Sequence, residues 1–158
     1  MTPDTLFAQA GTVAMLGWAV LILGPRRFPW INALPGLVLP ALLSGLYGVL
    51  VLVFFSGAEG GFGSLTEVRT LFADDWVLLA GWVHYLAFDL IVGSLVATRM
   101  DRVGVSRILQ APILLLVFLF GPLGALLALL MEASLQLGRA VTTLPVSIPL
   151  LRHRETLA

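Results

Sequence analysis

The amino-acid sequence has no cysteine and no lysine among its 158 residues, and only 11% of its residues are charged. The lack of cysteine excludes disulfide bonds, thiolate metal ligands and cysteine nucleophiles. A soluble domain of this size carries about a quarter charged residues, so the shortage of charge argues against that class. No run of basic residues indicates nucleic-acid binding. Hydrophobic residues instead make up 59% of the chain, which predicts membrane lipid as its main partner.

Four long apolar stretches are the predicted membrane spans. Each has about the 17 to 25 residues that a helix needs to cross the hydrocarbon, and they cover residues 7–23, 36–55, 76–98 and 112–131. We therefore predict an all-α polytopic membrane protein in which four transmembrane helices form a bundle within residues 1–137. The first stretch follows Asp4 and no basic residue, so it is interpreted as a retained helix rather than a secretory signal.

The loop between the second and third spans contains two helix-capping signals. Ser64 and Glu67 have the spacing of a capping box, which predicts a short helix over residues 64–72 on the membrane surface. Asp74 or Asp75 is expected to cap the third span.

The C-terminal segment is not predicted to span. Pro145 and Pro149 argue against a fifth transmembrane helix. Residues 138–158 are therefore predicted to form an interfacial or disordered tail.

The arginines predict the orientation in the membrane, since all nine basic residues are of this type. The first and third loops carry Arg26, Arg27, Arg99, Arg102 and Arg107, whereas the opposite side carries Arg69 and Arg139, with Arg152 and Arg154 farther out in the tail. Positively charged loops stay in the cytoplasm, so both termini are predicted to lie outside it. No plastid transit peptide precedes the first span, which favours the inner membrane of a bacterium.

Asp89 is the one charge near the middle of a predicted span. A carboxylate at the bilayer centre costs roughly 2.5 to 3.5 kcal/mol on insertion scales, so it needs a partner, a proton or a function. Ser44 and Tyr47 of the second span, beside Gly45 and Gly48, are its predicted hydrogen-bonding partners. Asp89 is interpreted either as a functional acid or as a packing residue that fixes helix register.

His84 is the second ionisable side chain of the third span. Helical geometry places it about 140° around the helix and about 7 to 8 Å along the axis from Asp89, so this helix alone cannot hold one ion with both residues. The other spans contain no His, Asp or Glu except Glu132 just past the fourth. We therefore predict no metal site and no cofactor. His84 either exchanges protons with a ligand opposite Asp89 or merely meets water and Tyr85.

Trp82, Tyr85 and Phe88 lie deeper than an interfacial aromatic belt requires. They are predicted to line a groove for a rigid apolar ligand. Pro122 lies at mid-depth in the fourth predicted span and is expected to bend that helix. A bend opposite Asp89 would favour a cavity, and helix packing alone is the alternative interpretation.

Three motifs together resemble one known family. They are DDW at residues 74–76, WVHYLAFDLIVG at 82–93 and FGPLG at 120–124, the last within a span that Pro112 opens. This pattern resembles the plant and bacterial family of abscisic-acid-deficient-four proteins, also described as neoxanthin-synthase-like, over about residues 7–131. The resemblance implies a four-span integral membrane protein. In plants the family is tied to converting violaxanthin into neoxanthin, an isomerisation that opens an epoxide and creates an allene.

The resemblance allows a hypothesis about roles. Asp89 would protonate the epoxide oxygen and His84 would remove a proton from the adjacent polyene carbon. The residues expected to contact the carotenoid are Trp82, Tyr85, Phe88, Tyr47 and Ser44. The alternative is a non-catalytic carotenoid or lipid binder, or an assembly subunit that forms a homo-oligomer or joins a membrane enzyme. A transporter is disfavoured, because the chain has one buried acid and no internal repeat.

Overall fold

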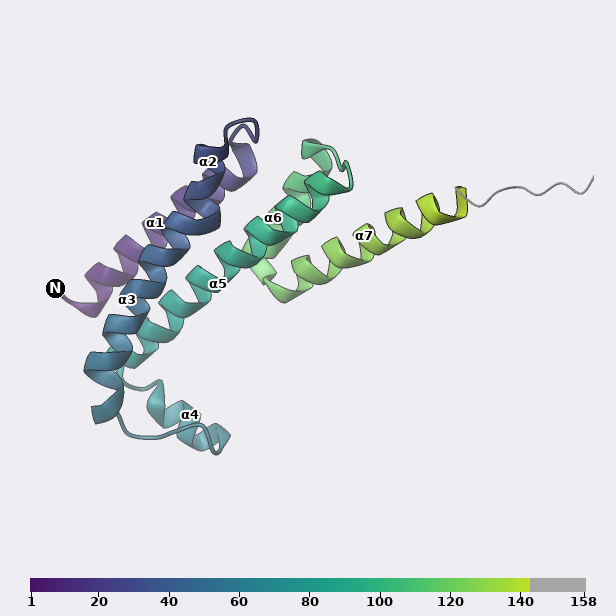
Figure 1. The fold of residues 1–158 in the computed structure, drawn as a ribbon. Helices are drawn as coiled ribbons and strands as arrows, with labels where there is room; N and C mark the ends of the chain where they lie inside the picture. The colour runs from purple at the N-terminus through teal and green to yellow at the C-terminus, as the bar shows by residue number, and fades with distance from the viewer. Residues whose placement is uncertain (143–158) are drawn as a thin grey trace, which may run out of the picture.

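The computed structural model describes residues 1–142, and within them every regular element is a helix. Figure 1 shows long helices packed side by side, with one short helix at one end and a last helix that leaves the bundle at an angle. The elements are α1 (Pro3–Leu23), α2 (Pro29–Ala33), η1 (Leu34–Val38), α3 (Leu39–Phe54), η2 (Phe55–Gly57), α4 (Leu65–Leu71), α5 (Asp75–Arg102), α6 (Arg107–Phe120) and α7 (Pro122–Thr142).

In the described part of the chain, three helices are long and apolar enough to cross a membrane. They are Pro3–Leu23, the continuous helix Trp30–Gly57 and Asp75–Arg102. The first three predicted spans therefore lie in helices of suitable length, and the protein is an integral membrane protein.

The second span begins with a π-helical turn that proline explains. In η1 the Leu39 amide donates to the carbonyl of Leu34, and Pro40 has no amide hydrogen to offer the carbonyl of Pro35. The hydroxyl of Ser94 on α5 donates to that carbonyl at 3.0 Å. A side chain of the third span thus satisfies a backbone group that the second span leaves free inside the membrane.

Helix α5 lies at the centre of the fold and contacts α1, α3, α6 and α7. Gly17 of α1 allows close approach, because a methyl group added there would lie 2.7 Å from Leu90. Gly93 of α5 plays the same part, since the ring of Trp18 occupies the space beside it. Gly45 and Gly48 of α3 do not mediate its contact with α5, because a methyl group at either position meets nothing within 4 Å.

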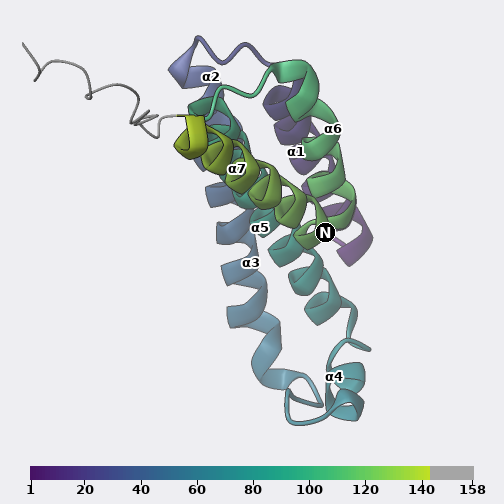
Figure 2. The same ribbon diagram turned by 90° about the vertical axis from the view of Figure 1, so that its right-hand side faces the viewer.

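The fourth predicted span is not one helix. Residues 112–131 fall partly in α6 and partly in α7, and the chain reverses at Gly121, whose φ of 23° lies in the left-handed region. Pro122 then starts α7, where a missing amide hydrogen costs nothing. Gly124 packs directly on the backbone at Val117, so α6 and α7 form a hairpin that is tight at its turn and opens away from it (Figure 2). The expected bend is a complete reversal.

The end of α7 returns to the side from which α6 starts. Arg139 donates to the carbonyl of Val103 at 2.7 Å, next to the turn between α5 and α6. Glu132 pairs with Arg99 of α5 at 3.0 Å. Because the hairpin enters and leaves on one side, the N-terminus and the end of α7 lie on opposite sides of the bundle. The predicted side of the C-terminus concerns residues outside the described part of the chain.

The two capping predictions are confirmed. Ser64 precedes α4 and accepts a hydrogen bond from the amide of Glu67 at 3.2 Å. Asp74 caps α5 by accepting from the amides of Trp76 and Val77. In the predicted tail, residues 138–142 belong to α7, and residues 143–158 lie outside the described part of the chain.

The bundle has two halves with separate cores. The aromatic half contains the starts of α1 and α5 and the end of α3, and its buried residues include Leu50 and Val83. The arginine-rich half contains the end of α1, the end of α5, and helices α6 and α7, and its buried residues include Trp18 and Leu114. The tip of the hairpin marks the boundary between them.

Candidate functional site

Asp89 lies at the boundary between the two halves, against the tip of the α6–α7 hairpin. A methyl group added at Gly121 would lie 2.8 Å from Oδ1 of Asp89, so the carboxylate contacts the backbone where the chain reverses. The side chain is buried, with 8% of the residue exposed. It lies about 20 Å along the α5 axis from Asp75, close to the centre of a typical bilayer.

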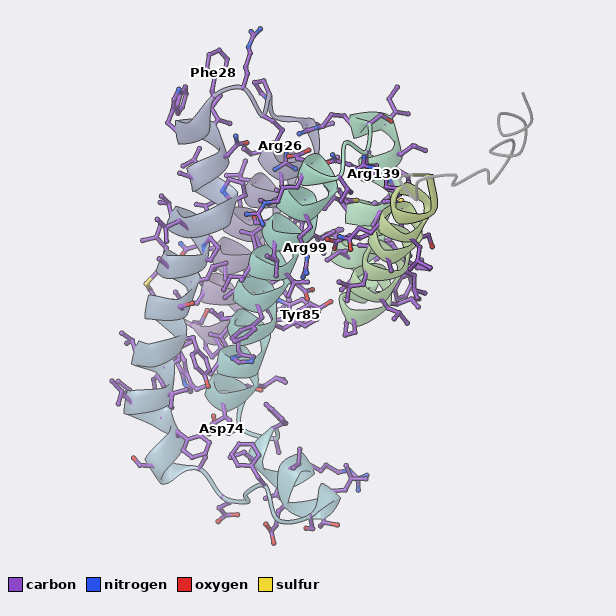
Figure 3. All side chains as sticks on the ribbon, turned by 45° about the vertical axis from the view of Figure 1, so that its right-hand side comes forward. Arg26, Phe28, Asp74, Tyr85, Arg99 and Arg139 are labelled. Carbon is purple, nitrogen blue, oxygen red and sulfur yellow. The ribbon has the colours of Figure 1, made fainter. Side chains whose placement is uncertain are left out.

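Tyr85 is the polar side chain that approaches Asp89 from α5 itself. The two residues are one helical turn apart on the same face of the helix, so the phenol lies beside the carboxylate. Figure 3 shows Tyr85 on the side of α5 that faces the hairpin. The acid is therefore held between a phenol and a backbone turn.

An aromatic row extends from Asp89 toward the start of α5. The rings of Trp82 and Tyr85 stack with centroids 5.5 Å apart, and Phe7 of α1 lies 5.5 Å from Trp82. Trp82 and Tyr85 are 41% and 38% exposed, which leaves this row open on its lipid-facing side. The hairpin reaches only to Asp89, so it does not cover the row.

A cleft of about 250 Å³ lies at the far end of the row. Its walls come from the first turns of α1 and α5 and include Asp4, Phe7, Asp75 and Trp82. The cleft, the aromatic row and Asp89 follow one another along one face of α5. This arrangement suits a long apolar molecule with a polar group near one end.

His84 lies on a different face of α5. Its ring is 5.1 Å from that of Tyr47 on α3 and 4.5 Å from that of Phe88. The predicted separation of His84 from Asp89 is confirmed, because the two side chains face different helices. The prediction that Tyr47 binds Asp89 is wrong, since Tyr47 contacts His84 instead.

The predicted ligand contacts divide between these faces. Trp82 and Tyr85 belong to the Asp89 face, and Phe88 and Tyr47 belong to the His84 face. Ser44 is exposed on α3, away from Asp89. One rigid ligand on the Asp89 face therefore cannot reach all the residues that were predicted to bind it.

No group of three or more His, Asp or Glu residues comes together in residues 1–142. The Asp89 face brings together two groups that carry an exchangeable proton, a carboxyl group and a phenol. It can also hold an apolar chain by stacking on aromatic rings.

A comparison with protein families identifies the family of the chain. The family described as ABA DEFICIENT 4-like matches residues 5–127. The chain belongs to the ABA DEFICIENT 4-like family. The matched segment ends inside α7, just beyond the hairpin tip, so it contains the candidate spans except for the first two residues of α1, and it contains Asp89. No curated protein and no solved structure matches the chain.

Membership connects this membrane protein at family level to the carotenoid and abscisic-acid pathway.

Two residues of the Asp89 face were missed as contacts by reasoning from sequence. Gly121 stood within a noted motif, but nothing in the sequence indicated that it touches Asp89. Phe7 appeared to be one more apolar residue at the start of a span, and only helix packing brings it to Trp82.

Proposed function

We propose that this ABA DEFICIENT 4-like protein binds a carotenoid along the Asp89 face and isomerises an epoxide at its end, with Asp89 as the proton carrier. One observation supports this above all: a buried carboxyl group at mid-depth ends an aromatic row that is open to lipid. The polyene would lie over Tyr85 and Trp82, and its oxygenated ring would lie at the hairpin tip.

The chemistry requires one proton and no other reagent. The proton of the Asp89 carboxyl group moves to the epoxide oxygen as one carbon–oxygen bond breaks. The adjacent polyene carbon then loses its hydrogen to the carboxylate, and the electron pair of that bond becomes the second double bond of the allene. Because the proton lost equals the proton gained, one carboxyl group can act as acid and then as base.

This assignment differs from the pairing of Asp89 with His84. The body of α5 lies between those two side chains, and His84 contacts Tyr47 and Phe88 on its own face. A ligand that reaches Asp89 over Tyr85 does not meet the imidazole. We assign His84 to packing against α3 and Tyr85 to positioning the carboxyl group.

The test uses a bacterial host that accumulates an epoxy-carotenoid and expresses the full chain. Asp89→Asn keeps the shape of the side chain and removes the acid, so the allenic product should fall by about a hundredfold or more. His84→Gln is the matched control on the opposite face and should retain the product. Both variants are also measured for membrane insertion.

Three outcomes would contradict parts of this proposal. Full product with Asp89→Asn would remove the catalytic role. Equal loss with His84→Gln would restore the pairing that the geometry argues against. No product from the wild-type chain, together with no visible carotenoid absorption after purification, would reject carotenoid handling as a whole.

The arginines support an orientation for the bundle. The end of α7 lies beside the turn between α5 and α6, so Arg139 joins the basic residues at the side that carries Arg26 and Arg107. Arg69 of α4 lies at the other end. We propose that the arginine-rich half faces the cytoplasm of a bacterium and that the N-terminus lies outside. A cysteine placed at Thr2 should react with an impermeant maleimide in intact cells, and one at Ser106 should not.

A second candidate function is an assembly role, which one observation favours. The lipid-facing side of α3 presents small residues at helical spacing, and added methyl groups at Gly45 and Gly48 meet nothing within 4 Å. Such faces let transmembrane helices approach closely. If the protein assembles through this face of α3, Gly45→Leu should shift it from an oligomeric band to a smaller one in native electrophoresis. The carotenoid products of the host should stay the same.

A further inference from the structure

A second site lies in the arginine-rich half, at the end of α1 and the start of α6. The arginine cleft has a volume of about 480 Å³. The residues that line it include Ile22, Leu23, Arg26, Arg107, Ile108 and Ala111. Figure 3 places Arg26 near the end of the bundle that also carries Arg139. The cleft therefore lies at the membrane surface, far from the Asp89 face.

The two arginines use only part of their hydrogen-bonding capacity. Nη2 of Arg107 donates to the carbonyls of Ile22 and Gly24 at 2.8 and 2.9 Å. Nη2 of Arg26 donates to the carbonyl of Leu21 at 3.2 Å. Nη1 of Arg107 and Nε of Arg26 are buried and form no hydrogen bond within residues 1–142. Because Nε of Arg26 faces Asp101, the donor that remains without an acceptor among the described residues is Nη1 of Arg107.

The cluster is also short of negative charge. Asp101 lies 3.6 Å from Nε of Arg26, and its other oxygen accepts a hydrogen bond from Gln110 at 2.6 Å. Burial lowers the pKa of Arg26, Asp101 acts in the opposite direction, and Arg107 adds to the lowering through like-charge repulsion. Asp101 pairs with Arg26, and within the described residues no carboxylate forms an ion pair with Arg107.

We propose that the arginine cleft binds the phosphate group of an anionic phospholipid between Arg26 and Arg107. A phosphate supplies the missing negative charge and accepts from guanidinium groups in the geometry that they favour. The apolar side chains of Ile22, Leu23 and Ile108 continue from the arginines toward the bilayer, where acyl chains lie. A free phosphate ion shares the headgroup chemistry but would make no use of this apolar wall.

The competing explanation is purely structural. Arg26 and Arg107 satisfy the last carbonyls of α1, and cations at the end of a helix stabilise it without any ligand. That explanation predicts that their substitution lowers stability and leaves lipid binding unchanged. Lipid affinity and stability measured on the same variants therefore distinguish the two explanations.

The experiment is native mass spectrometry of the full chain in a neutral detergent, titrated with phosphatidylglycerol, with uncharged diacylglycerol, or with inorganic phosphate. We expect one tightly bound phosphatidylglycerol and no comparable binding of diacylglycerol. Arg107→Gln should weaken the bound phosphatidylglycerol about tenfold, the loss typical of a hydrogen bond between charged groups. Arg107→Lys should recover only part of that loss. Lysine keeps the positive charge but lacks the planar set of N–H donors with which a guanidinium group binds two phosphate oxygens.

Two controls keep the outcome clear. Arg27→Gln removes the same charge from an adjacent exposed position, where Arg27 lies over the ring of Phe28, and should change the affinity about twofold or less. Ala111→Leu fills the cleft and leaves every arginine hydrogen bond in place, so it should also weaken lipid binding. Thermal unfolding is recorded for each variant.

The results that overturn the proposal are specific. Equal affinities of the wild type, Ala111→Leu and Arg107→Gln for phosphatidylglycerol would leave only the structural explanation. Binding of inorganic phosphate with no preference for the lipid would reject a phospholipid as the occupant. Equal losses with Arg27→Gln and Arg107→Gln would reduce the effect to diffuse surface attraction.

Discussion

The two halves of the bundle use the same central helix in opposite ways. In the arginine-rich half, α6 and α7 cover α5. Glu132 of α7 forms an ion pair with Arg99, Arg139 donates to the carbonyl of Val103, and Gln110 of α6 donates to Asp101. In the aromatic half, the face of α5 that carries Trp82 and Tyr85 stays partly exposed within the described residues. Because the hairpin stops at Asp89, a charged residue lies where a packed surface becomes an open one. The covered half of α5 therefore gains packing and polar contacts, whereas the open half keeps its aromatic side chains partly exposed.

A substitution at the hairpin tip is expected to lower the stability of the protein most. Gly121→Val would place a branched side chain at a φ of 23° and against Oδ1 of Asp89. We expect a loss of about 3 kcal/mol or more in the free energy of unfolding, with α6 and α7 detached from α5. Thermal unfolding in detergent measures the loss. Gly11→Ala is the control, since a methyl group there meets nothing within 4 Å. A stable Gly121→Val protein would mean that the reversal is not required.

The ion pair between Arg99 and Glu132 tests how much electrostatic attraction holds α7 against α5. A double-mutant cycle with Arg99→Gln and Glu132→Gln should give a coupling of about 0.5 to 1 kcal/mol. The value is modest because the Arg99 side chain is 44% exposed. Unfolding of the four proteins is compared in one detergent at low and high salt. A coupling of zero would leave the attachment of α7 to apolar contacts and to Arg139.

Ser94→Ala tests the polar contact that crosses from α5 to the π-helical turn. Removing the hydroxyl leaves the carbonyl of Pro35 without its donor, so we expect a loss of about 0.6 kcal/mol, the average for such bonds in membranes. Ser94→Thr keeps a hydroxyl group and is the control. Equal unfolding temperatures for Ser94→Ala and the wild type would show that another group satisfies the carbonyl.

The open half is expected to give the smallest change in stability. Trp82→Leu removes one ring of the aromatic row, and its free energy of unfolding should change by about 0.5 kcal/mol or less because the site faces lipid. Carotenoid absorption of the purified protein should nevertheless fall. A large loss of stability with unchanged absorption would contradict the distinction between the two halves.

Much of this architecture could be predicted from local patterns. Apolar length located three spans, because lipid satisfies no backbone groups and only a long apolar helix can cross. Capping chemistry located α4 and the start of α5, because Ser64 and Asp74 act on amides two or three residues away. The separation of His84 from Asp89 follows from helical period alone. Each of these properties depends on residues close together in the chain.

The reversal at Gly121 could not be obtained in this way. The run of apolar residues from 112 to 131 is long enough for a span, and Pro122 is compatible with a bend, a kink or a turn. What selects the turn is the packing of Gly124 on Val117 and the ties between α7 and the end of α5, all of which join distant segments. The same reason explains why Tyr47 was paired with the wrong partner.

Sequence alone therefore determined that the chain lies in a membrane, that α5 carries a carboxyl group at its middle and that His84 lies on another face. Tertiary structure alone decided what meets that carboxyl group, which half of α5 is covered and on which side α7 ends. The physical reason is that hydrophobic length and helical period are local properties. The contact between Asp89 and Gly121 depends on how four helices fill the space around a fifth.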